Sequence, residues 1–230
     1  DLPLHHQIIK MKKVIPVLIC ICCCTALIHG QNSKIDSMLQ VIITSKEDTD
    51  KVNTLNRLAY VFMNNDPDTS IFFAGEAEAL SMKLNYKMGI VAAQPTISKA
   101  KINLGKFDEA LEISINAIKL CDELLSEATG TEKTGNKSII LMQKARAYNN
   151  IGIIYYYQGN YPEALKNYFE NLKISEQTGD KQYIAISSDN IGIIYTTQGN
   201  YPEALKIFYT SLKLYEETGD KEGMARTYNN

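Results

Sequence analysis

Two consecutive stretches decide the fold: IGIIYYYQGNYPEALKNYFENLKISEQTGDKQYIAISSDN (residues 151–190) and IGIIYTTQGNYPEALKIFYTSLKLYEETGDKEGMARTYNN (residues 191–230). They align without a gap, and about 23 of their 40 positions are identical. Self-similarity at a fixed period of about 20–50 residues is typical of solenoids, in which each repeat is one supersecondary unit. The sequence therefore predicts a repeat protein.

Each unit is predicted to be a pair of helices. Residues 151–158 are apolar and aromatic at helical spacing, and Gly159 ends this helix because glycine adopts the left-handed conformation at little cost. Asn160 is the predicted N-cap of the second helix, with Glu163 completing a capping box. Pro162 lies in the first turn, where no backbone N–H is needed. The second copy repeats these signals, so the predicted fold class is all-α.

The spacing of small and aromatic residues resembles the tetratricopeptide repeat pattern. The residues that carry the resemblance are Gly152, Tyr155, Gly159, Tyr161, Ala164, Leu165 and Tyr168, and then Gly192, Tyr195, Gly199, Tyr201, Ala204, Leu205 and Phe208. The common pattern has about 34 residues, whereas these units carry about six more and the phrase TGDK. This longer form resembles repeats of many bacterial signalling proteins. The resemblance implies a right-handed superhelical solenoid of antiparallel helix pairs.

The chain before the two copies reads as weaker repeats. Residues 31–48 are predicted to form an amphipathic lead-in helix that covers the first repeat, and residues 49–230 the array. The predicted units span about 50–86, 87–136, 137–180 and 181–220, with a partial unit at 221–230. A solenoid end needs a polar capping helix, so the sequence predicts an array truncated at its C-terminus.

Two features interrupt the regular pattern. Gly105 and Gly159 are 54 positions apart, against 40 for Gly159 and Gly199, so about 14 residues are inserted. We expect the insertion to form a flexible loop with some added helix before Ser138. Pro95 lies inside a predicted helix and is expected to kink it.

Residues 1–30 read as upstream residues followed by a signal peptide. Met11 begins a basic start, and residues 14–28 form an uncharged, mostly apolar run too short to span a bilayer. Cleavage is predicted after Gly30, with Ala26 as the alternative, and residues 1–10 precede a plausible start methionine. Lipidation at one of the leader cysteines is a further alternative, although no small residue precedes any of them. The leader predicts an exported chain, periplasmic or membrane-anchored facing the periplasm.

The composition restricts the chemistry of the segment after the leader. All three histidines precede residue 31, and Cys121 is the one cysteine after it, which argues against disulfides and Cys/His zinc sites. The segment after the leader has 21 basic and 25 acidic residues and no basic stripe, so nucleic-acid binding is not expected. No glycine loop for phosphate and no metal-spacing cluster is present, so we predict no cofactor and no catalytic residue. Cys121 is expected to be a buried small hydrophobe.

In the family that the repeats resemble, the first helices of successive units line a concave groove that binds ligand segments. The resemblance implies a peptide-binding groove presenting Arg146, Asn149, Asn150, Ile153, Tyr156, Tyr157, Asp189, Asn190, Ile193, Thr196, Thr197, Arg226, Asn229 and Asn230. The pairs Arg146–Asn150 and Arg226–Asn230 resemble basic-plus-asparagine pairs that grip a peptide carboxylate, although Ile186 departs from the pattern.

The same residues have structural alternatives. The asparagines could bond to neighbouring helices and the arginines could be solvated. Tyr155 is expected to pack inward, and Tyr156 and Tyr157 could belong to the core or offer a flat amphipathic surface.

The predicted function is protein or peptide binding by a repeat scaffold. The order of the segments, which is a leader, a degenerate first repeat and then TGDK-type repeats, resembles the N-terminal sensor region of bacterial sensor histidine kinases. This resemblance implies a connection to the membrane, through the leader or through a span beyond residue 230. One alternative is a stand-alone periplasmic or surface scaffold that assembles complexes. Another is the N-terminal part of a cyclase or other enzyme.

Overall fold

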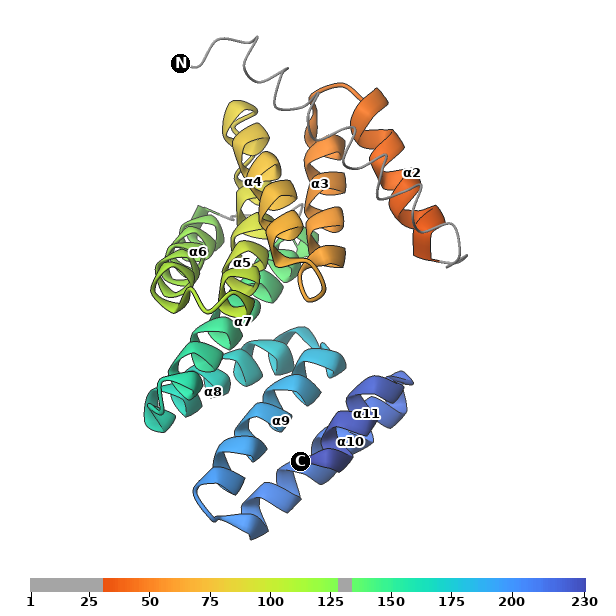
Figure 1. Ribbon diagram of the computed structural model, residues 1–230. Coiled ribbons are helices and arrows are strands. Elements are labelled where there is room, and N and C mark those ends of the chain that lie inside the picture. The colour runs from red at the N-terminus through yellow and green to blue at the C-terminus, as the bar shows by residue number, and fades with distance from the viewer. Residues whose placement is uncertain (1–30, 128–133) are drawn as a thin grey trace. The chain divides into compact units, whose positions relative to one another are not determined.

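The computed structural model describes residues 31–127 and 134–230, and the regular secondary structure of these residues is helical (Figure 1). The chain divides into two units, residues 1–45 and 46–230. The predicted leader, residues 1–30, lies outside the described residues. In the first unit, α2 (Gln31–Thr44) ends four residues before the predicted end of the lead-in helix. Asp48 belongs instead to the next helix, where its side chain accepts a hydrogen bond from Lys51 N at 3.0 Å.

The second unit consists of helices that follow one another along the chain. Their bounds are α3 (Thr49–Phe62), α4 (Pro67–Lys83), α5 (Lys87–Asn103), α6 (Phe107–Glu127), α7 (Thr134–Tyr157), α8 (Tyr161–Thr178), α9 (Lys181–Thr197), α10 (Tyr201–Thr218) and α11 (Lys221–Asn229). Consecutive helices pack against each other, and α3 also lies beside α5, and α5 beside α7. The predicted all-α solenoid of antiparallel helix pairs is confirmed (Figure 1).

Glycine ends the first helix of a pair as predicted. Gly159 has φ +73°, its N–H donates to Tyr156 O at 3.0 Å, and the N–H of Asn160 donates to Tyr155 O at 2.9 Å. The side chain of Asn160 caps α8 by accepting from Glu163 N at 3.4 Å. The second half of the predicted capping box is wrong, because the N–H of Asn160 is already used by Tyr155 O. Asn200, the predicted cap of α10, makes no such side-chain bond.

Part of the insertion between the second and third pairs lengthens helices, which agrees with the predicted added helix, while the loop predicted around residues 128–133 stays a prediction. Helix α6 has 21 residues and α7 has 24, whereas α8 and α10 have 18 each. Helix α7 begins at Thr134, four residues before the predicted Ser138, and residues 128–133 lie outside the described residues. The longer helices are supported by a small core in which Ile140 packs with Val91 and Cys121.

Helix α5 runs through Pro95, whose carbonyl oxygen accepts a hydrogen bond from Asn150 Nδ2 at 2.8 Å. The kink that Pro95 predicts stays a prediction.

Within a pair, the two helices approach closely where a glycine of the first faces a ring of the second. A Cβ atom added to Gly192 would lie 2.6 Å from Phe208 Cε1, and one added to Gly152 would clash with the Tyr168 ring. In the second pair, Ser98 and Ser114 take these two positions, and their hydroxyl groups hydrogen-bond at 2.7 Å. Small residues at this position therefore set the distance between the paired helices.

Replacing Gly192 by alanine tests this contact. We expect Gly192→Ala to lower the free energy of unfolding by about 1–3 kcal/mol, because the new methyl group overpacks against Phe208. Urea denaturation followed by circular dichroism measures the change. Gly75 in α4 is the matched control, since a Cβ there meets nothing within 4 Å. Gly75→Ala should be neutral or stabilising by up to about 1 kcal/mol.

The double variant Gly192→Ala, Phe208→Leu separates a clash from a general defect. If the ring causes the loss, the two substitutions together cost less than the sum of their separate costs. Additive losses would contradict this explanation.

Candidate functional site

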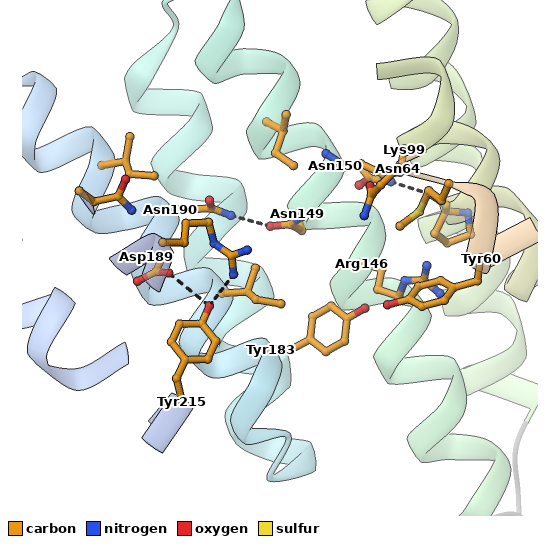
Figure 2. A pocket seen from close by; sticks show the side chains of 17 residues that line it. Tyr60, Asn64, Lys99, Arg146, Asn149, Asn150, Tyr183, Asp189, Asn190 and Tyr215 are labelled. Atoms are coloured by element: carbon orange, nitrogen blue, oxygen red, sulfur yellow. Dashed lines mark hydrogen bonds between the residues drawn. The ribbon is translucent and has the colours of Figure 1, made fainter. Parts of the chain in front are cut away.

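One pocket of about 370 Å³ lies on the inner side of the second unit, where the first helices of successive pairs meet (Figure 2). We call it the inner pocket. Its lining residues are Tyr60, Met63, Asn64, Pro95, Lys99, Arg146, Asn149, Asn150, Ile153, Tyr183, Ile186, Asp189, Asn190, Ile193, Tyr215, Arg226 and Asn230. The volume lies within the roughly 300–1,000 Å³ that is typical of ligand pockets.

Most of the residues predicted for the groove line this pocket. They are Arg146, Asn149, Asn150, Ile153, Asp189, Asn190, Ile193, Arg226 and Asn230. The others, Tyr156, Tyr157, Thr196, Thr197 and Asn229, are not among its lining residues.

The residues that the pocket leaves out lie at the C-terminal ends of their helices. Thr197 is exposed, and its hydroxyl donates to Ile193 O at 2.9 Å. Tyr157 is 64% exposed and stacks on Phe107 with ring centroids 5.5 Å apart, so of its two alternatives the core position is wrong. Tyr156 and Tyr155 are partly buried and pack against the core around Tyr168.

Arg146 is held by its neighbours, so the alternative of a solvated arginine is wrong at this position. Its two terminal nitrogens donate to Gln143 Oε1 at 3.0 Å and to Thr96 Oγ1 at 3.3 Å. The guanidinium group also lies 4.8 Å from the centroid of the Tyr60 ring, within the range of a cation–π interaction. These contacts fix its direction without any ligand.

The asparagines bond to neighbouring helices, as the structural alternative predicts. Asn150 is 3% exposed, and its amide donates to Pro95 O in α5. Asn190 Nδ2 donates to Asn149 Oδ1 at 2.9 Å, which joins α9 to α7 (Figure 2). Among the described residues, the nitrogen of the Asn149 amide and the oxygen of the Asn190 amide have no hydrogen-bond partner. This pair therefore offers one donor and one acceptor to the pocket.

Asp189 is the centre of a hydrogen-bonded cluster that joins three helices. It is 3% exposed and accepts from Ser211 Oγ at 2.5 Å and Thr227 Oγ1 at 2.9 Å. Tyr215 OH donates to it at 3.2 Å and accepts from Arg226 Nη2 at 3.2 Å. Burial raises the pKa of the Asp189 carboxyl group, and the three hydroxyl donors partly oppose the shift.

Tyr215 lines the pocket although it comes from α10, the second helix of its pair. It reaches the inner side because Gly223 of α11 has no side chain, and a Cβ there would lie 2.5 Å from Tyr215 Cδ1. Sequence reasoning considered only first helices and missed it. The two preceding units have Gln143 and Tyr183 at the repeat position of Gly223. The glycine at this position is the sequence signal that could have indicated the contact with Tyr215.

Lys99 was also missed, although its spacing could have found it. It lies six residues before Gly105, as Ile153 lies before Gly159 and Ile193 before Gly199. Burial lowers the pKa of the Lys99 amine. The pocket lining thus contains three basic side chains, Lys99, Arg146 and Arg226, against the single carboxylate of Asp189.

The residues that the structure describes give little support for metal binding or for a cysteine nucleophile. They contain no group of three or more His, Cys, Asp or Glu side chains that could hold a metal ion. Cys121 is buried, as predicted, and burial raises the pKa of its thiol to about 12, so that the nucleophilic thiolate is scarce at neutral pH. Across residues 31–127 and 134–230, no helix combines the length and apolar character that crossing a membrane requires.

A repeat family model matches the C-terminal part of the chain. The tetratricopeptide repeat family model matches residues 143–217 and 183–230. No curated protein sequence matches the chain.

Several solved structures share the fold. A Rap protein complexed with Competence and Sporulation Factor is 20% identical, with a TM-score of 0.69 over 84% of this chain and 51% of that one. BtubC from P. vanneervenii is 17% identical, with a TM-score of 0.60 over 83% and 76%. A Signal Transduction ATPase with Numerous Domains, which has a tetratricopeptide repeat sensor and comes from Pyrococcus horikoshii, is 16% identical, with a TM-score of 0.58 over 84% and 28%. This chain therefore spans about half of the Rap protein.

The Asp189 cluster gives a testable pH dependence. Folding raises the pKa of Asp189 above its ordinary value of 3.8, so the folded chain holds the proton more tightly than the unfolded chain does. We expect the free energy of unfolding of the wild type, relative to Asp189→Asn, to fall as the pH rises above about 3.8. Urea denaturation of both proteins at successive pH values measures this difference.

Thr227→Val is the companion variant. It removes a donor that favours the ionised carboxylate, so the fall should extend to higher pH than in the wild type. A difference that grows with pH would contradict the raised pKa.

Proposed function

We propose that this chain, whose residues 143–230 consist of tetratricopeptide repeats, binds an extended protein or peptide segment in the inner pocket. The observation that carries the proposal is the composition of the pocket lining. Amide, aromatic and isoleucine side chains from successive first helices meet there, and no catalytic constellation does. A repeat array of this kind is a scaffold that presents an extended binding surface.

The lining fits the chemistry of a peptide. A peptide backbone carries one N–H donor and one C=O acceptor per residue. The Asn149–Asn190 pair offers the complementary acceptor and donor, because one oxygen and one nitrogen of these two amides remain unused. Ile153, Ile186 and Ile193 also line the pocket and are only partly buried, so they can pack against apolar side chains of the segment. In ligand pockets, placed polar groups fix the orientation of the ligand and apolar side chains bury its surface.

The place of this scaffold in a larger protein is also proposed. We infer an exported sensory region of a membrane-bound signal-transduction protein of the histidine kinase type. The apolar run at residues 14–28 and the long TGDK-type repeats support this proposal. The name of the Pyrococcus ATPase includes a tetratricopeptide repeat sensor. It supports the use of this fold as a sensor, in a protein whose other part is an ATPase instead of a histidine kinase.

Sequencing the reading frame through its stop codon tests this assignment. A membrane span followed by a histidine kinase core after residue 230 would support the sensor. A stop codon shortly after one more helix would favour a stand-alone scaffold, and a catalytic motif without a span would favour another enzyme. An alkaline phosphatase fusion after residue 45 tests export, since this enzyme is active only when its disulfides form outside the cytoplasm.

Peptide binding is tested by selection from a random heptapeptide library on the purified chain, residues 31–230. We expect the selected peptides to bind the wild type. Their affinity for the Asn190→Ala variant should be about tenfold lower, because one hydrogen bond to the peptide backbone is lost. Asn190 is the chosen position because Asn149 Oδ1 keeps a contact with Asn171 Nδ2 at 3.5 Å when Asn190 is removed.

Thr197→Ala is the matched control on the same helix, outside the pocket lining. Isothermal titration calorimetry should give an affinity within twofold of the wild type. Equal losses of affinity in the Asn190→Ala and Thr197→Ala variants would contradict the site. So would selected peptides whose affinity depends on no residue of the pocket.

A further inference from the structure

We propose that two copies of this chain associate through one exposed face of α8 and the equivalent face of α10. We call these the outer faces, and they consist of Lys166, Phe169, Lys173 and Glu176 in α8 and of Lys206, Tyr209, Lys213 and Glu216 in α10. In the dimer, the outer face of α8 in each copy packs antiparallel against the outer face of α10 in the other copy. None of these residues lines the inner pocket, so the association does not depend on what the pocket binds.

Both outer faces carry the same order of side chains. In each helix, a first lysine, an aromatic residue, a second lysine and a glutamate follow one another at intervals of three, four and three residues. Such intervals place side chains on one face of a helix. All of these charged residues are exposed.

The aromatic residues of the outer faces are exposed although they are large. Phe169 is 44% exposed and Tyr209 is 69% exposed. The exposure of Phe169 is not an effect of the end of the array, because α8 packs against both α7 and α9. Leu205, one turn before Tyr209, is also 57% exposed. Exposed apolar side chains that gather on one surface mark an interaction site.

The charges of the outer faces are largely unpaired. Lys166 contacts Glu163 of its own helix at 3.3 Å. The other three lysines and both glutamates of the outer faces make no ion pair with any residue that the structure describes. These charges are therefore available to another molecule.

The order of the charges makes two outer faces complementary in antiparallel packing. The first lysine of one face then meets the glutamate of the other, and each aromatic ring meets the second lysine of the other face. Opposite charges are thus placed together, and the lysine covers the ring with its stem and its ammonium group.

A two-fold axis brings both pairs of faces together at once. Helices α8 and α10 run in the same direction, since both are antiparallel to α9, which packs against each of them (Figure 1). A two-fold axis between α8 and α10 therefore places each against the other helix of the second copy, in a self-complementary interface.

Helix α6 shows that the repeat itself does not require this pattern. Its equivalent positions hold Glu112, Ile115, Lys119 and Asp122. In the same packing, Glu112 would meet an acidic residue, and Asp122 is already paired with Lys144 at 2.5 Å. The complementary order is therefore a property of α8 and α10.

A second copy fits the outer faces better than an anionic lipid surface does. Exposed lysines beside aromatic rings suit lipid headgroups, but the glutamate on each face would be repelled by anionic lipids. A second copy uses the lysines and the glutamates alike. Only one face of each of two helices takes part, so the interface is small and we expect the dimer to dissociate on dilution.

The test measures association of the purified chain, residues 31–230, by sedimentation velocity at increasing protein concentration. We expect the wild type to form a dimer. The double variant Lys166→Glu, Lys206→Glu should raise the dissociation constant of the dimer more than about tenfold, because glutamates would then face glutamates. Circular dichroism shows whether the variant keeps its helices.

A compensating pair of substitutions separates the contact from a general effect of charge. Adding Glu176→Lys and Glu216→Lys to the double variant should return the dissociation constant to within about threefold of the wild type, since the opposite charges then face each other in exchanged places. The matched control adds Glu76→Lys and Glu123→Lys instead. These two glutamates are exposed on α4 and α6, so the control has the same net charge and should not restore the dimer.

Three results would overturn the proposal. One is a wild type that stays monomeric at every concentration. Another is a dimer that the Lys166→Glu, Lys206→Glu variant leaves unchanged, or that both compensating pairs restore equally. The third is flotation with vesicles of anionic lipid that this double variant loses, without any dimer in solution, which would assign the outer faces to a membrane surface.

Discussion

The structure depends on the close approach of two helices at a position without a side chain. Gly152 and Gly192 leave space that the rings of Tyr168 and Phe208 fill, and no larger residue fits without displacing them. In the second pair, two hydroxyl groups of Ser98 and Ser114 meet at this position instead. Because the paired helices are held at this distance, the residues on the other side of each first helix point consistently toward the pocket.

A polar contact between the two helices of a pair recurs in successive pairs. Asn149 meets Asn171 in the third pair, and Asp189 meets Ser211 in the fourth, at the same positions of the repeat. The change from an amide to a carboxylate alters the hydrogen-bonding groups that this repeat position offers to the pocket. Asn149 keeps an unused donor, whereas Asp189 is surrounded by hydroxyl groups and contributes no free acceptor. Near-identical repeats thus place different chemistry at equivalent positions of one surface.

The sequence alone predicts the helix pairs and most of the residues that line the pocket. Period and turn glycines determine which face of each helix looks inward, and so Arg146, Asn190 and Ile193 were found. The period does not tell how far along the helix the pocket extends, and Thr197, which was predicted for the groove, is not among the lining residues. It also cannot show that Tyr215 passes over Gly223, because that contact joins two units whose spacing is known only in three dimensions. The sequence also does not tell how much of the insertion is helical, since Ile140 gains a core only when α6 and α7 lie together.

The Asp189 cluster has a consequence for cooperativity. In a solenoid, each repeat contacts its neighbours only, so stability is close to a sum of local terms and the end can open by itself. One carboxylate that accepts hydrogen bonds from both α10 and α11 makes the opening of either helix expose a buried acid. We therefore expect helices α9, α10 and α11 to open as a single foldon, with amide exchange rates that rise and fall together. A ligand that rests against this cluster would be felt as slower exchange at Thr227, a residue that does not line the pocket.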